Sequence, residues 1–203
     1  MRGPGAEGRR DRRLIAGILL AAGLSSRFGR QKLLEVWQGE TLVRRAARSF
    51  LDAGLRPLVG VVPADARFAA ALDGMPVRLV MNQEPERGIS RSIGLGLGAL
   101  PVETDAVMIG VADQPNLTSA ALRRLIDAFD AGRIVTAQFG DHAGNPVIFD
   151  RRFFPQLLAL EGDRGGQVVV RNHPDALVQV ELPTRMGVDI DRPEDWPAEA
   201  GPQ

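Results

Sequence analysis

The chain of 203 residues contains no cysteine and only two histidines. The absence of cysteine excludes disulfides, thiolate metal sites and a cysteine nucleophile, and it fits a protein that works in a reducing compartment such as the cytoplasm. Because His142 and His173 are too few for a histidine-rich metal site, we expect any bound metal to be a hard cation held by carboxylates.

The chain also lacks an excess of charge of one sign and a long apolar run. Its formal net charge is zero, so neither a nucleic acid nor a membrane surface is indicated as a partner. No apolar stretch reaches the roughly 20 residues that a transmembrane helix needs. Apolar residues make up 44% of the chain, which is typical of a globular domain with a real core.

The N-terminal residues 1–13 are rich in arginine and glycine. We predict that they form a disordered tail in front of a single domain that spans residues 14–203. A competing interpretation takes Arg9–Arg13 and Leu14–Leu24 as the charged and apolar regions of a cleaved signal peptide. We favour the tail, because cleavage would remove the apolar run that positions the loop after it.

Apolar runs alternate with helical patterns over the rest of the chain. The expected strands cover residues 14–20, 57–62, 77–81, 106–111, 134–138, 146–149 and 177–182, and the expected helices cover residues 41–53, 65–72, 90–100, 119–129 and 151–160. This alternation predicts an α/β fold with three layers, α/β/α, around a mostly parallel sheet. Such sheets bind ligands at the carboxyl ends of their strands, which directs attention to the loops at 23–32, 82–92 and 113–116.

The first of these loops ends at Lys32, the only lysine among 25 lysine and arginine residues. Gly23 and Gly29 allow backbone amides to approach a ligand closely, Ser25 adds a hydroxyl donor, and Arg27 and Lys32 add two positive charges. Together they predict a cradle for a triphosphate. The loop is not a P-loop, which requires lysine and then serine or threonine after its last glycine, and it lacks the second glycine of a dinucleotide fingerprint.

Carboxylates follow the buried strand at 106–111 and recur near the C-terminus. Asp113 is a candidate ligand for Mg²⁺, which prefers one or two carboxylates plus substrate phosphates. The alternative is that Asp113 only opens a turn before Pro115. Asp189 and Asp191 fall on one face of an extended segment, so either is a candidate second ligand, with Asp189 favoured. The alternative for that segment is an exposed edge strand.

The segment at 82–92 leaves a short strand and enters a helix whose first turn offers amides and hydroxyls. The candidates for contact with a base edge or a ribose are Asn82, Gly88, Ser90 and Ser92. Ser90 has an equally good interpretation as the helix N-cap. The alternating glycines Gly94, Gly96 and Gly98 fall inside the helical pattern and predict close packing of this helix.

In this order, these segments resemble the MobA-like nucleotidyltransferases, and most closely their molybdenum cofactor cytidylyltransferase branch, over about residues 15–196. The shared stretches are LAAGLSSRFG at 20–29, KLL at 32–34, GISRS at 88–92 and ADQP at 112–115. Two further stretches are more specific to the branch, GNPVIF at 144–149 and LEGDRGG at 160–166.

The resemblance implies a Rossmann-like, GT-A-like fold of the nucleotide-diphospho-sugar transferase type. It implies that a phosphate of molybdopterin attacks the α-phosphate of CTP, with Mg²⁺ as cofactor, and that pyrophosphate leaves. A molybdenum hydroxylase would receive the cytosine dinucleotide product. By position, the base and ribose would lie on Ala21, Ala22 and Gly23, the phosphates on Arg27 and Lys32, the metal on Asp113 with Asp189 or Asp191, and the acceptor on Asn145, Asp163 and Arg164.

The chain departs from the family pattern in places that bear on the acceptor. Gly165-Gly166-Gln167 stands where the family commonly has Gly-Ala-Arg, which removes a positive charge from the loop that would face the acceptor. Ile89 replaces a frequent methionine and Arg192 a frequent threonine. Three alternatives stay open: a guanylyltransferase, a cytidylyltransferase for a sugar or polyol phosphate, and a non-catalytic molybdenum cofactor chaperone. The chaperone would not need Arg27, Lys32 and Asp113 together.

Overall fold

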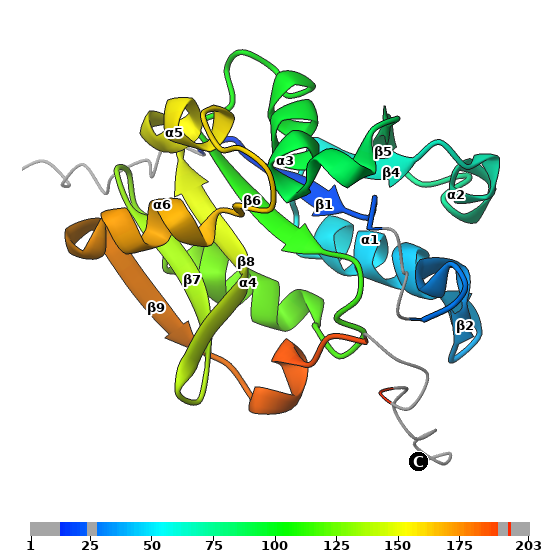
Figure 1. Ribbon diagram of the computed structural model, residues 1–203. Coiled ribbons are helices and arrows are strands. Elements are labelled where there is room, and N and C mark those ends of the chain that lie inside the picture. Colours follow the sequence, from blue (N-terminus) through cyan, green and yellow to red (C-terminus); the bar gives the residue numbers. More distant parts are fainter. Residues whose placement is uncertain (1–12, 24–27, 191–194, 196–203) are drawn as a thin grey trace, which may run out of the picture.

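The computed structural model describes residues 13–23, 28–190 and 195. These residues form a seven-stranded sheet in the order β5-β4-β1-β6-β8-β7-β9 (Figure 1). β8 pairs antiparallel with both of its neighbours, and every other pair in the sheet is parallel. The strands are β1 Ile15–Leu20, β4 Leu58–Pro63, β5 Val77–Asn82, β6 Ala106–Val111, β7 Ile134–Phe139, β8 His142–Asp150 and β9 Leu177–Glu181.

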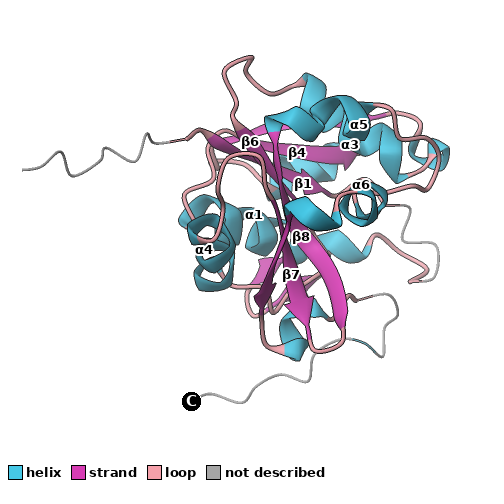
Figure 2. Ribbon diagram, turned by 90° about the vertical axis from the view of Figure 1, so that its left-hand side faces the viewer, coloured by secondary structure: helices cyan, strands magenta, loops and turns pink. Residues whose placement is uncertain are grey.

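Helices cover both faces of the sheet and create two hydrophobic cores (Figure 2). The helices are α1 Leu42–Asp52, α2 Ala66–Ala71, α3 Ile89–Gly98, α4 Ser119–Asp127, α5 Phe154–Leu158 and α6 Gln167–Asn172. Phe50 of α1 and Leu122 of α4 belong to one core, and Ile93 of α3 and Leu157 of α5 belong to the other. The predicted three-layer architecture with a mostly parallel sheet is therefore confirmed.

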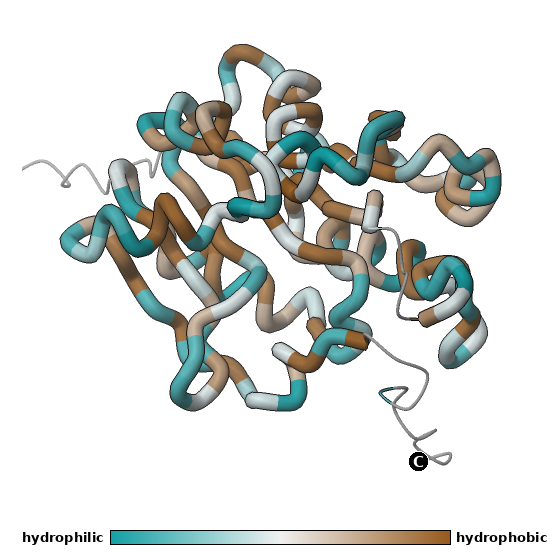
Figure 3. Tube along the Cα trace, viewed as in Figure 1, coloured by the Kyte–Doolittle hydropathy of each residue, from teal (hydrophilic) through white to brown (hydrophobic). Residues whose placement is uncertain are grey.

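The central strands are apolar along their length, as the brown colour of β1 and β6 in Figure 3 shows. Within β6 the residues from Ala106 to Gly110 are all buried, which explains why the sequence has no alternation there. No helix in the described part of the chain is long and apolar enough to cross a membrane. Arg13, which the sequence assigned to the tail, lies 3.6 Å from the carboxylate of Asp130.

All seven predicted strands are present in the sheet, and some of the predicted helix boundaries agree with the structure. Thr118 caps α4 by accepting a hydrogen bond from the Ala121 amide at 3.3 Å, as predicted. Gly54 follows α1 with φ of 95°, which fits its predicted role as the helix stop. The expected helix at 151–160 is interrupted, because a 3-10 turn at Arg151–Phe153 precedes α5.

Two features were not predicted from the sequence: α6, and a small hairpin of β2 Val36–Trp37 with β3 Glu40–Thr41. The close packing predicted for the three alternating glycines is present at only one of them. A Cβ built on Gly96 would lie 2.7 Å from Ile18 Cγ2, so this glycine lets α3 rest directly on β1. A Cβ on Gly94 or Gly98 meets nothing within 4 Å among the described residues.

Candidate functional site

The carboxyl ends of β1, β4, β5 and β6 meet at one edge of the sheet, and the predicted site residues begin there. Ala21 continues β1 and donates its amide to Val61 O at 2.8 Å, while Ala112 donates to Leu20 O at 3.1 Å. Ala21 and Ala22 are buried, whereas Gly23 is exposed. The chain therefore leaves the core at Gly23, where backbone groups come within reach of a ligand.

Lys32 and Asp113 are brought together at this edge from loops 81 residues apart. The ammonium of Lys32 donates to Asp113 Oδ2 at 2.8 Å and also to the carbonyl oxygen of Ile190. Ile190 in turn donates its amide to Asp113 O at 3.0 Å. Lys32 is only 9% exposed, and a buried ammonium is tolerable only when it is paired and hydrogen-bonded in this way.

The carboxylate of Asp113 is suited to a metal. Its Oδ1 atom is buried and has no hydrogen-bond partner among the described residues, while Oδ2 faces Lys32. A buried carboxylate oxygen without a partner costs free energy, and a hard cation such as Mg²⁺ would satisfy it. The described residues contain no cluster of three or more histidine, cysteine or acidic side chains that could hold a metal by themselves. The Asp113 carboxylate is therefore a candidate ligand for a divalent metal.

Asp189 precedes Ile190, so the backbone bonds of Ile190 bring it to the neighbourhood of Asp113, and its side chain is exposed. Asp191 lies outside the described residues, as do Ser25 and Arg27 of the first loop. The choice between Asp189 and Asp191 as a metal ligand, and the phosphate role of Arg27, stay predictions.

The polar residues at 82–92 hold their own segment in shape. Asn82 is 1% exposed, donates to Ser92 Oγ at 3.0 Å, and accepts from the Glu84 amide at 3.0 Å. Gly88, with φ of 90°, is the N-cap of α3, so the N-cap interpretation of Ser90 was wrong. The Ser90 amide is not free either, since it donates to Gly162 O at 3.2 Å. Contacts of these residues with a nucleotide stay predictions.

The residues predicted to face the acceptor lie on two elements. β6 and β8 pair as far as Ile109 opposite Val147, and Asn145 lies in β8 two residues beyond that pair. Its neighbour Pro146 contacts β6, because a Cβ built on Gly110 would lie 3.3 Å from Pro146 Cβ. Asp163 and Arg164 are exposed in the loop between α5 and α6. This loop meets the segment at 82–92 through the bond between Ser90 and Gly162.

One supporting residue was missed. Arg45 of α1 donates through Nε to Pro115 O at 2.8 Å, and its guanidinium lies 4.4 Å from the centre of the Trp37 ring. Glu40 lies 3.9 Å from the Arg45 guanidinium and also pairs with Arg48. Burial lowers the pKa of Arg45, and the nearby Glu40 carboxylate opposes that shift. Arg45 thus holds the turn that carries Asp113, and nothing in the sequence separates it from the other arginines of α1.

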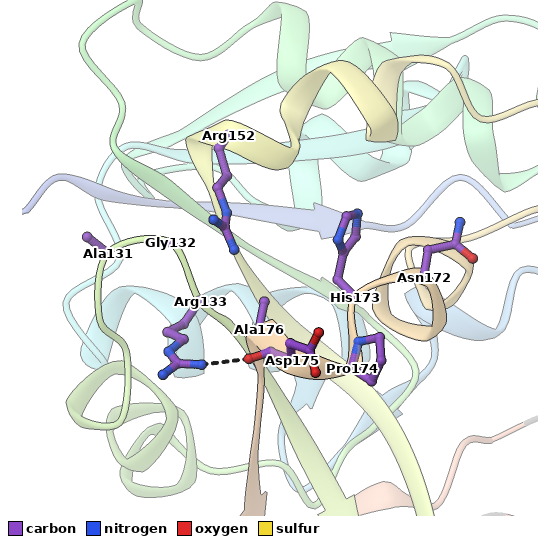
Figure 4. Close-up of a pocket in the computed structure, with 9 residues that line it drawn as sticks. All are labelled: Ala131, Gly132, Arg133, Arg152, Asn172, His173, Pro174, Asp175 and Ala176. Carbon is purple, nitrogen blue, oxygen red and sulfur yellow. Dashed lines mark hydrogen bonds between the residues drawn. The ribbon is translucent and has the colours of Figure 1, made fainter.

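The opposite edge of the sheet contains a cavity of about 390 Å³ that takes no part in this site. It lies where β7 and β9 begin, and it is lined by Ala131, Gly132, Arg133, Arg152, Asn172, His173, Pro174, Asp175 and Ala176 (Figure 4). Arg133 donates to Asp175 O across it at 2.8 Å. Since this cavity faces the amino ends of the parallel strands, the edge with Lys32 and Asp113 is the candidate active site.

Known proteins are similar to this chain over most of its length. Residues 17–177 match the family described as the MobA-like NTP transferase domain. Nicotine blue oxidoreductase of Paenarthrobacter nicotinovorans is 31% identical over 170 residues, which cover 79% of this chain and 83% of that protein. A probable molybdenum cofactor guanylyltransferase of Chloroflexus aggregans is 34% identical over 115 residues, covering 55% of this chain and 52% of that protein.

Solved structures of similar proteins share the whole architecture. Rv0371c of Mycobacterium tuberculosis superposes with a TM-score of 0.80 at 26% identity and covers 91% of this chain and 96% of that one. A structure of Rv0371c in complex with manganese gives a TM-score of 0.74 at the same identity and coverage.

Proposed function

The chain belongs to the MobA-like NTP transferase domain family and is a nucleotidyltransferase, and we propose that it is a Mg²⁺-dependent CTP:molybdopterin cytidylyltransferase. The observation that carries this proposal is the buried pair of Lys32 and Asp113 at the carboxyl end of β6, beside the exposed Gly23. It supplies one ammonium and one partly unsatisfied carboxylate where a triphosphate and a metal are needed.

In the proposed reaction an oxygen of the acceptor's terminal phosphate bonds to the α-phosphorus of CTP. The bond from that phosphorus to the bridging oxygen of the β-phosphate breaks, and pyrophosphate leaves. This transfer needs no protein nucleophile, since positioning and charge stabilisation supply most of the rate. Lys32 would hold a phosphate oxygen and Asp113 the metal, which neutralises charge on the phosphates when it is bound. Nucleotidyltransferases of this family use divalent metals.

The acceptor is assigned from the stretches at 144–149 and 160–166. Asn145, near the end of β6, would donate to it, and Asp163 and Arg164 would approach it from the loop before α6. Gln167 lacks the positive charge that the family commonly has at this position, and this difference concerns the acceptor, not the nucleotide. The nearest alternative is that this chain uses GTP in the same reaction, because a probable molybdenum cofactor guanylyltransferase from Chloroflexus aggregans matches about half of the chain. The absence of cysteine is consistent with a cytoplasmic location of the protein, whichever of the two nucleotides it uses.

The test is pyrophosphate release with Mg²⁺ and molybdopterin, in parallel with CTP, GTP, ATP and UTP. We expect release with CTP, and its loss in Lys32→Ala and in Asp113→Ala. Arg67→Ala is the matched control, because Arg67 is exposed on α2 and pairs only with Asp65 among the described residues.

Each other outcome identifies an alternative. Release with GTP alone would indicate a guanylyltransferase, and release only with a sugar or polyol phosphate would exclude molybdopterin. Full function of Asp113→Ala in cells, with no release by the wild type, would favour the chaperone. Oxidation or reduction of nicotine blue by the wild type would instead point to the activity named for the relative from Paenarthrobacter nicotinovorans.

A further inference from the structure

Two loops that the proposed function assigns to different substrates are locked together through their backbones. Gly88, in the nucleotide segment at 82–92, packs on Gly162, in the acceptor segment at 160–166. A Cβ built on Gly88 would lie 2.3 Å from the carbonyl carbon of Gly162, 2.4 Å from its oxygen and 2.7 Å from the amide nitrogen of Asp163. No side chain fits in that space, and φ of 90° at Gly88 is itself a conformation that favours glycine.

The contact is reinforced on both sides of the two glycines. Ser90 donates its amide to Gly162 O at 3.2 Å, which satisfies a donor in the first turn of α3 that has no partner inside the helix. The backbone amide of Arg164 donates to Glu161 O at 3.3 Å, so the acceptor segment turns back at this point. A Cβ built on Gly165 would lie 3.7 Å from Ile89, and the segment therefore stays against the start of α3.

The elements behind the two segments are packed as well. α3 and α5 lie side by side in Figure 1, and Ile93 and Leu157 are fully buried in the same core. A cavity of about 690 Å³ extends from Ser90 and Gly162 along the exposed side of α3, where it is lined by Gly94 and Gly98. At Gly88 and Gly162 the backbones of the two segments touch directly.

We propose that Gly88 and Gly162 are positioning residues that set the register of the acceptor segment against the nucleotide segment. This inference rests on the proposed function, because it takes the segment at 160–166 to face the acceptor. The approach of the acceptor phosphate to the α-phosphorus then depends on a contact made by two residues without side chains. A side chain at Gly88 would displace Gly162, Asp163 and Arg164 together.

The size of the displacement follows from the distances. An ordinary contact of a Cβ atom begins at 3.4 Å, whereas the carbonyl carbon of Gly162 lies 2.3 Å away from the built Cβ. Gly88→Ala therefore requires the acceptor segment to move by roughly 1 Å, and a misplacement of that size costs on the order of 100-fold in rate. We expect kcat/KM for molybdopterin to fall about 100-fold, at least tenfold more than kcat/KM for CTP.

The experiment compares Gly88→Ala with Gly74→Ala. Gly74 has φ of 74°, and a Cβ built there meets nothing within 4 Å among the described residues, so this variant carries the backbone strain without the collision. We expect Gly74→Ala to keep the kinetics of the wild type. A loss of kcat/KM for CTP in Gly88→Ala as large as the loss for molybdopterin, or larger, would overturn the proposal. A smaller fraction of folded enzyme lowers both values equally, and weaker nucleotide binding lowers the value for CTP.

Hydrogen exchange gives a readout that does not need the substrates. In the wild type we expect the Ser90 amide to exchange more slowly than the Ala120 amide, which occupies the same second position in α4. In Gly88→Ala the amides at 160–166 should exchange faster. Unchanged exchange at residues 160–166 would refute the positioning role of the Gly88–Gly162 contact, whatever the acceptor is. Failure of wild-type pyrophosphate release with molybdopterin, with the exchange result as expected, would instead refute the proposed function and the acceptor role of this segment.

Discussion

Replacement of Lys32 by methionine tests how much the ion pair with Asp113 contributes to the free energy of unfolding. The Lys32 side chain is 11% exposed and the Asp113 side chain 21% exposed, and their charged atoms lie 2.8 Å apart. Removing one partner of a fully buried pair costs about 3–5 kcal/mol, because the other charge stays buried and unpaired. Since the Asp113 side chain is partly exposed, we expect Lys32→Met to lower the free energy of unfolding by about 2–3 kcal/mol.

A double-mutant cycle separates the pair from its surroundings. Lys32→Met also removes the donor to Ile190 O, but that loss occurs in the single and the double variant alike and cancels. We expect Lys32→Met and Asp113→Asn together to destabilise the protein less than the sum of the single changes, by about 1–2 kcal/mol. Urea unfolding gives the free energy of unfolding of the wild type, the two single variants and the double variant. Effects that add within about 0.5 kcal/mol would refute the reasoning. The exposed pair of Arg67 and Asp65 is the control, for which we expect additive effects.

Two further predictions concern residues outside the pair. Arg45→Leu should weaken the apparent affinity for the divalent metal by about 10–100-fold, because it removes the hydrogen bond to Pro115 O that holds the turn with Asp113. Titration of pyrophosphate release with the metal measures this affinity. Gly94→Ala should stabilise the protein by about 0.5–1 kcal/mol, since its Cβ meets no described atom within 4 Å, whereas Gly96→Ala should destabilise it through collision with β1; thermal unfolding of the two variants distinguishes them.

The parts of the fold that the sequence predicted are those with a strong local signal. The run at 106–111 is buried on both faces, and a continuous apolar segment of that length is a strand signal in itself. The hairpin of β2 and β3 has only two residues in each strand, too few for any period to be read. α6 was missed because it is short and begins directly after Gly165 and Gly166, which favour a loop.

The candidate site also contains residues that could be predicted from the sequence and contacts that could not. Lys32 and Asp113 could be proposed from their residue types and from their places after two strands. Their third partner, the carbonyl of Ile190, could not, because a backbone oxygen 158 residues away carries no residue-specific signal. The same reason hides the Gly88–Gly162 contact. The sequence does not distinguish Gly88, where a side chain is excluded, from Gly94, where a Cβ meets no described atom within 4 Å, because the atoms that exclude a side chain are known only from the tertiary structure.

The position of the only lysine follows from this geometry. Its ammonium touches a carboxylate oxygen and a backbone carbonyl in a space that is almost closed to solvent. A compact ammonium on a flexible stem can reach both acceptors, whereas the planar guanidinium of arginine carries its donors in a rigid fork that suits a bidentate partner. A chain that otherwise relies on arginine therefore has a physical reason to place lysine at position 32. In the proposed reaction the same ammonium would also contact a phosphate oxygen of the nucleotide.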